Sequence, residues 1–280
     1  MRNQIDLTFD TPEPIDLHVE NARGLVRVSA TATARTTVSI IGERAEEFDV
    51  HHVEAGERSA ISIVPPRSSG GLFGRDARAE IVVELPTASR LRAKVGSSDL
   101  VAEGRLDDTR VDSGSGDVSL DVVEGDVVVQ SGSGDLHAGH LLGDAHLRSG
   151  SGDIVVRRAE SALVVTTGSG DVRVDSADGL AVKTGSGDAH VQSLGGEAVF
   201  TTGSGDLVVA QVASGRVTAK TASGDVRIGV DDGTPVWTDV RTASGRLTSM
   251  LPSTGEPAPD QPYLEVRATT ASGDVTLHPS

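Results

Sequence analysis

The chain has 280 residues and a formal net charge of −16, with no cysteine and only 2% aromatic residues. So acidic a surface argues against binding nucleic acid through its phosphates, which requires clustered lysine and arginine. The lack of cysteine excludes disulfides and thiolate metal sites. Because rings are scarce, Val, Leu, Ile and Ala must fill the interior, which favours thin, regular layers of β-structure.

The N-terminal residues 1–86 contain several β-type segments but no repeated motif. These segments include IDLHVEN, GLVRVSA, TTVSIIG and AEIVVELP. We expect a β-rich cap of irregular coils that protects one edge of the fold, joined near Pro86 to a regular domain over 87–280. The first residues include no apolar run of signal-peptide length, and no later run approaches a membrane span. A cytoplasmic location is therefore expected.

A basic loop, PPRSSGGLFGRDAR, occupies residues 65–78 of this first region. It places Leu72 and Phe73 next to Arg75 in an otherwise acidic chain. An apolar tip among arginines can contact a partner protein or an anionic membrane surface. Simple disorder explains the same composition equally well.

A short motif related to Ser/Thr-Gly-Ser-Gly-Asp recurs from residue 99 onward. Its aspartates, separated by 17 to 19 residues, are Asp99, Asp117, Asp135, Asp153, Asp171, Asp188, Asp206 and Asp225. The motif returns as TASGRL, with Arg246 in the aspartate position, and as TASGDV, with Asp274. A fixed period of this length is the signature of a solenoid, in which each repeat stacks on the previous one.

Each period contains two short stretches in which apolar residues alternate with other residues. One follows the aspartate, as in Val172–Arg173–Val174, and the other precedes the motif, as in Leu180–Ala181–Val182. This alternation indicates strands with one buried face. The sequence therefore predicts an all-β fold, a single-stranded parallel β-helix or β-solenoid with coils of ~18 residues. Right-handed winding is expected for parallel crossovers.

The repeated motif has two interpretations. Its glycines permit a tight corner, and its serine and aspartate can bond nearby backbone N–H groups, so a structural corner accounts for it. The alternative is a calcium ladder, because stacked carboxylates repel one another and a bound cation relieves the repulsion. That ladder would use Asp117, Asp135, Asp153, Asp171, Asp188, Asp206 and Asp225. We favour the corner and expect no cofactor.

Two further surfaces are candidates for contacts between proteins. An outward row of small apolar side chains includes Val128, Val164 and Val199. Such a row can mark an interface, although β-propensity alone explains it. The last repeat, SGDVTLHPS, ends the chain, so we expect an uncovered C-terminal coil that can pair with a second copy. The alternatives are that the insertion at 252–262 folds over this end and that Pro279 discourages pairing. No residue can be singled out as catalytic, and no enzyme is expected.

The repeated motif, together with the segments FDTPEPIDLHVENARGLVRVSA and AEIVVELPTASRLRAKVGSSDL, resembles a bacterial β-strand-repeat family of unknown function labelled "putative adhesin". The resemblance implies a parallel β-helix with no known catalytic residues, and some relatives are tied to cell-envelope stress responses through protein contacts. We expect a non-catalytic scaffold or protein-interaction module that self-associates, with an unidentified protein partner. Two alternatives stay open: a calcium-stabilised surface or secreted adhesin, and an acidic nucleic-acid mimic.

Overall fold

Strands make up almost all of the regular structure. The computed structural model describes residues 3–55, 58–66, 78–251 and 262–280. Within these residues it has 21 strands, one short 3₁₀ turn (Ala45–Glu47) and no α-helix, so the all-β prediction is confirmed. No helix in the described segments is long and apolar enough to cross a membrane. Two compact units, Met1–Gly143 and Asp144–Ser280, divide the chain.

The first unit begins with a mixed sheet. Its strands are β1 (Asn3–Asp10), β2 (Asp16–Thr31), β3 (Arg35–Gly42), β4 (Asp49–Ala55), β5 (Arg58–Val64), β6 (Arg78–Pro86) and β7 (Ser89–Ser113). β3 pairs antiparallel with β1 and β6, and β4 pairs antiparallel with β5. β2 pairs in parallel with β5, β6 and β7. Among the described strands, all pairings of β7 are parallel, whereas β6 still has one antiparallel neighbour. This change lies close to the expected joint near Pro86, and the domain boundary itself stays a prediction.

The first coils follow β7 in the same unit. They contain β8 (Val118–Val123), β9 (Val127–Ser131) and β10 (Leu136–Leu141). β8 pairs in parallel with β7 and β10, so that Leu100, Val118 and Leu136 lie side by side. Each of these residues follows a motif aspartate, and the period of the sequence is therefore the step from one coil to the next.

The second unit contains the same type of coil. Its strands are β11 (Ala145–Ser149), β12 (Ile154–Thr167), β13 (Val172–Thr184), β14 (Ala189–Thr202), β15 (Leu207–Val212), β16 (Gly215–Thr221), β17 (Val226–Val230), β18 (Val236–Thr242), β19 (Leu247–Ser249), β20 (Leu264–Thr270) and β21 (Val275–Pro279). The alternation read from the sequence is the burial pattern observed. Val172 and Val174 are buried whereas Arg173 is exposed, and stacked aliphatic side chains form the core.

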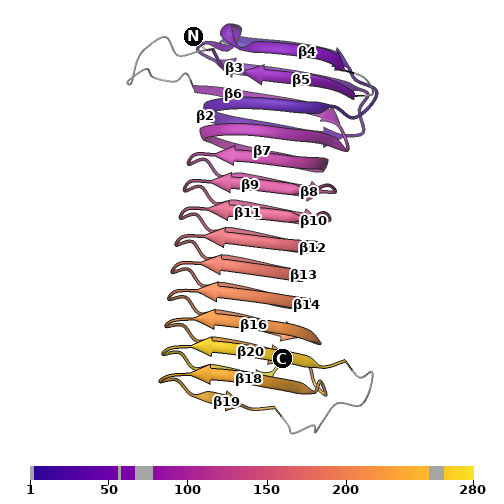
Figure 1. Ribbon diagram of the computed structural model, residues 1–280. Helices are drawn as coiled ribbons and strands as arrows, with labels where there is room; N and C mark the ends of the chain where they lie inside the picture. Colours follow the sequence, from indigo (N-terminus) through magenta and orange to yellow (C-terminus); the bar gives the residue numbers. More distant parts are fainter. Residues whose placement is uncertain (1–2, 56–57, 67–77, 252–261) are drawn as a thin grey trace. The chain divides into compact units, whose positions relative to one another are not determined.

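The last coils of the second unit do not stack in sequence order. β20 lies between β16 and β18, pairing in parallel with both (Figure 1). β21 likewise pairs with β17 and β19. The C-terminal coil is therefore inserted into the stack, and its Leu264, Val266 and Val275 are completely buried. The prediction that this coil is uncovered is wrong, because the coil that contains β18 and β19 lies outside it.

Candidate functional site

The repeated motif forms the corner that follows the second strand of each coil. The Thr167 hydroxyl accepts a hydrogen bond from the Gly170 N–H at 3.1 Å, and Thr184 does the same for Gly187 at 2.9 Å. A Cβ atom on Gly170 would lie 2.0 Å from the carbonyl oxygen of Gly152, the equivalent residue of the preceding coil. The corner therefore needs the hydroxyl to close the turn and the glycine to let the coils approach.

The motif aspartates form a ladder of hydrogen bonds between coils. Within each unit, the Oδ1 atom of one motif aspartate accepts a bond from the backbone N–H of the aspartate in the neighbouring coil. In the first unit the bonds run from Asp117 to Asp99 (3.1 Å) and from Asp135 to Asp117 (2.9 Å). In the second they run from Asp171 to Asp153 (2.8 Å), Asp188 to Asp171 (2.9 Å), Asp206 to Asp188 (2.8 Å) and Asp225 to Asp206 (2.8 Å). Each carboxylate thus satisfies a backbone donor at a corner.

The geometry favours the structural interpretation of the motif over the calcium ladder. The Oδ1 atoms of the ladder already accept backbone N–H groups, at 2.8–2.9 Å for Asp117, Asp171 and Asp188. Across the described segments, no group of three or more His, Asp or Glu side chains is placed to hold a metal ion. The calcium ladder stays a prediction to be tested with the ion itself.

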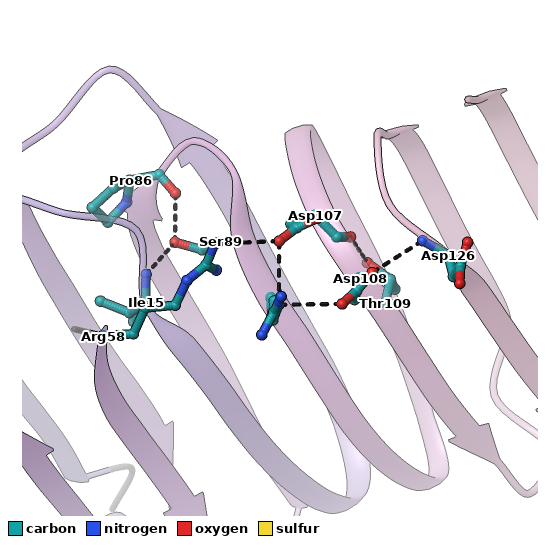
Figure 2. A network of polar contacts seen from close by, with 9 residues as sticks. Ile15, Arg58, Pro86, Ser89, Asp107, Asp108, Thr109 and Asp126 are labelled. Atoms are coloured by element: carbon teal, nitrogen blue, oxygen red, sulfur yellow. Dashed lines mark hydrogen bonds and ion pairs between the residues drawn. The ribbon is translucent and has the colours of Figure 1, made fainter. Parts of the chain in front are cut away.

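A polar network joins β5 to β7 in the first unit (Figure 2). Asp107 accepts from Arg58 (3.5 Å) and Arg90 (3.2 Å), and Arg90 also reaches Asp108 at 3.2 Å. The buried Ser89 hydroxyl donates to the Pro86 carbonyl at 2.7 Å and accepts from a backbone N–H at 2.9 Å. Two arginines thus balance two carboxylates, and the buried Ser89 hydroxyl is fully engaged, so the network fastens strands together.

A hollow of about 520 Å³ lies next to this network, on the face formed by β2, β7 and β9. Of its lining cations, Lys94 pairs with Glu20 at 3.4 Å and Arg110 pairs with Asp112 at 3.6 Å. Within the described residues Arg92 makes no ion pair. Because Asp108, Asp112 and Asp126 also line the hollow, its charge is close to balanced and does not single it out as a binding site.

The outward valine row exists in the second unit as a column of neighbours. Val164 lies next to Ala181, which lies next to Val199. Val164 is half-buried, and the side chain of Val199 is 47% exposed. Val128 occupies a half-buried position on β9 of the first unit. The loop candidates Leu72, Phe73 and Arg75 lie outside the described residues.

The sequence analysis missed a concentration of exposed apolar side chains at the outermost coil of the second unit. Trp237, Leu247 and Met250 are 49%, 44% and 62% exposed, and the neighbouring Tyr263 is 45% exposed. The signal was available, because the only Trp and the only Tyr of the chain are both in this region. The sequence alone did not place Trp237 near Tyr263, because the pairing of β18 with β20 does not follow the order of the coils in the sequence.

The inserted strand β20 is held there by a buried carboxylate. Glu265, whose side chain is 8% exposed, accepts bonds from the Nε atoms of Arg216 and Arg267, both at 2.6 Å. The hydrogen bond from Arg216 lowers the pKa of Glu265, against the opposing effect of burial. Arg267 also lies over the Trp237 ring, 5.7 Å from its centre. The network therefore links β16, β20 and β18.

A family model described as Toastrack DUF4097 matches residues 14–278. A "putative lipid binding protein" of Parabacteroides distasonis is similar in structure at 13% identity and a TM-score of 0.43, covering 98% of this chain and 96% of that one. A "putative adhesin" of Parabacteroides merdae is similar at 10% identity and a TM-score of 0.40, with coverage of 99% and 95%. The family match confirms the predicted family resemblance. Among curated proteins, none matches.

Proposed function

The chain belongs to the Toastrack DUF4097 family, and from this premise we propose that it is a non-catalytic β-solenoid scaffold that binds other protein chains, first of all a second copy of itself. Its repeated hydroxyls and carboxylates are engaged in joining corners and coils, as the bonds from Gly187 to Thr184 and from Asp206 to Asp188 illustrate. Its buried Ser89 hydroxyl both donates and accepts. These hydroxyl and carboxylate groups hold the coils together, and none of the groups named here is a free nucleophile.

The open coil that contains β18 and β19 carries the proposal. Among the described strands, β18 pairs only with β20 and β19 only with β21, so each has an edge without a partner. Leu247 occupies an inward position, opposite the buried Val275, yet its side chain is 44% exposed. Unpaired strand edges with exposed apolar side chains are sites where further strands add.

A second copy suits this edge for two reasons. It offers the same unpaired strands, so two ends can pair about a twofold axis and close as a dimer. The aspartate ladder ends in Arg246 at this coil, and two such ends therefore meet without opposing terminal carboxylates. Like charges facing each other across paired strands would destabilise the contact.

Light scattering after gel filtration, over a wide range of protein concentration, tests the proposal. We expect the native chain to form dimers or larger assemblies and Leu247→Lys to shift them to monomer. Val199→Lys is the matched control, because it places the same charge at an exposed apolar position of the outward valine row. A strict monomer at every concentration would overturn self-association. Loss of assembly in Val199→Lys alone would assign the interface to the valine row instead.

A further inference from the structure

A single column of basic and threonine side chains crosses the coils of the second unit. Neighbouring members face each other in the strand register: Arg148, Thr166, Lys183, Thr201, Lys220, Thr269 and Arg241. Because adjacent strands lie about 4.8 Å apart, the cations are spaced by roughly 9.6 Å with one hydroxyl between them. We call these seven residues the basic–threonine column.

The cations of the column are available to a ligand. Arg148, Lys183 and Lys220 are exposed, and within the described segments none of them makes an ion pair. Arg241 is paired with Asp239 at 3.4 Å. The column has no acidic member although the whole chain has a net charge of −16. Its charge is therefore of the opposite sign to that of the protein as a whole.

We propose that the basic–threonine column binds a linear chain of inorganic polyphosphate that lies across the strands, along the direction in which the coils stack. Lys183 stands between Thr166 and Thr201, so an ammonium and a hydroxyl can both donate to the oxygens of one phosphate group. Charge-assisted hydrogen bonds of this kind are the stronger ones in proteins. The column ends at Arg241 on β18, the strand proposed to pair with a second copy, but Lys183 and Lys220 lie on β13 and β16, away from that edge.

The arrangement favours a chain over a membrane surface. The cations form one line, and carboxylates lie near it on the same unit. Glu197 is 74% exposed on the strand that carries Thr201, and Asp188 is exposed at the corner that follows Lys183. A planar anionic surface would have to approach these carboxylates as well. A single polymer chain can follow the column and avoid them.

The arrangement also favours phosphate over an acidic peptide. β13 pairs with β12 on one side and with β14 on the other, so the backbone around Lys183 has no free edge. Extended peptides gain much of their affinity by adding a strand to such an edge. A ligand that is recognised through side chains alone, with several acceptor oxygens at each charged group, fits the column better.

Calorimetric titration with inorganic polyphosphate at about 0.1 M salt, where the Debye length is about 10 Å, tests the proposal. We expect the native chain to bind, and Lys183→Glu/Lys220→Glu to bind about tenfold more weakly or worse. The matched control is Arg157→Glu/Arg173→Glu, which changes the net charge equally on exposed residues of the other strand stack. We expect it to stay within about twofold of the native affinity, because contacts beyond a Debye length contribute little. Unchanged melting temperatures establish that both variants fold.

Several results would overturn the proposal. The absence of polyphosphate binding, or an equal loss in both double variants, would remove the column as a site. Equal affinity for polyglutamate of the same length would show that phosphate is not the recognised group. Binding to phosphatidylglycerol vesicles without binding to polyphosphate would point to a membrane surface. None of these outcomes bears on self-association, which light scattering measures separately.

Discussion

The backbone N–H of Arg246 donates to the Oδ1 atom of Asp274 at 2.8 Å, although Asp274 follows Arg246 by 28 residues. The N–H of Asp274 donates in turn to Asp225 at 2.9 Å. The aspartate ladder thus records the spatial order of the coils, which differs from their order in the sequence. Each carboxylate accepts a hydrogen bond from the next coil of the stack. Arg246 has no carboxylate, and its coil is the last one of the stack in the second unit.

The ladder predicts opposite behaviour for two substitutions of Asp188. Asp188→Ala removes the acceptor of the Asp206 N–H, and we expect it to cost about 0.5–1.5 kcal/mol of unfolding free energy. Asp188→Asn keeps an acceptor and removes one of a series of like charges, so its stability should equal or exceed that of the native chain. Urea denaturation measures both, and an Asn variant as unstable as the Ala variant would contradict the ladder.

Calcium should leave the melting temperature unchanged if the aspartates act only as acceptors for backbone N–H groups. A thermal scan in chelator and then in excess calcium makes the comparison. A bound ion would stabilise the folded chain in proportion to its concentration over its dissociation constant. A calcium-dependent rise that disappears in Asp188→Asn would reinstate the metal ladder.

Two glycines of the second unit distinguish the effect of a steric clash between coils from the effect of losing a glycine without a clash. A Cβ atom on Gly170 would meet the Gly152 carbonyl oxygen at 2.0 Å, whereas on Gly179 its nearest neighbour would be 3.9 Å away. We expect Gly170→Ala to destabilise strongly, by more than the roughly 1 kcal/mol typical of point substitutions. Gly179→Ala should be neutral or slightly stabilising. Similar melting temperatures for the two variants would show that the coils can move apart at little cost.

Acid should weaken the attachment of β20. The folded chain holds the pKa of Glu265 below its ordinary value, chiefly through the hydrogen bond from Arg216. A lowered pKa contributes stability above the unfolded-state value and loses it as the pH falls through the folded-state value. We expect Glu265→Gln to be less stable than the native chain at neutral pH and to lose less stability in acid. Parallel pH profiles for the two proteins would contradict this account of Glu265.

The coil pattern was predictable because burial imposes it residue by residue. A residue such as Val174 must be apolar and its neighbour Arg173 need not be, so the alternation reveals the strand and its inward face. The period then gives the register, because each step brings equivalent residues together. The strands and their register can both be inferred from a single sequence, because each depends only on which residues are apolar and on how the motif is spaced.

The stacking order of the last coils was not predicted, because TASGRL and TASGDV fit equally well onto the coil before them. Strand pairing depends on backbone hydrogen-bonding groups and on the volume of the inward side chains, and TASGRL and TASGDV are alike in both. One local sign was present: Arg246 lacks the carboxylate that any following coil would need. The basic–threonine column also escaped notice, since its order depends on Thr269 lying between Lys220 and Arg241.

The central claim is that the open coil of β18 and β19 pairs with a second copy, and thiol cross-linking tests it most directly. The chain has no cysteine, so Leu247→Cys carries a single thiol at this coil and Thr201→Cys a single thiol on the face of β14. With a short bis-maleimide, we predict efficient cross-linked dimers for Leu247→Cys and few for Thr201→Cys at the same concentration. Equal yields, or more dimer from Thr201→Cys, would contradict the claim.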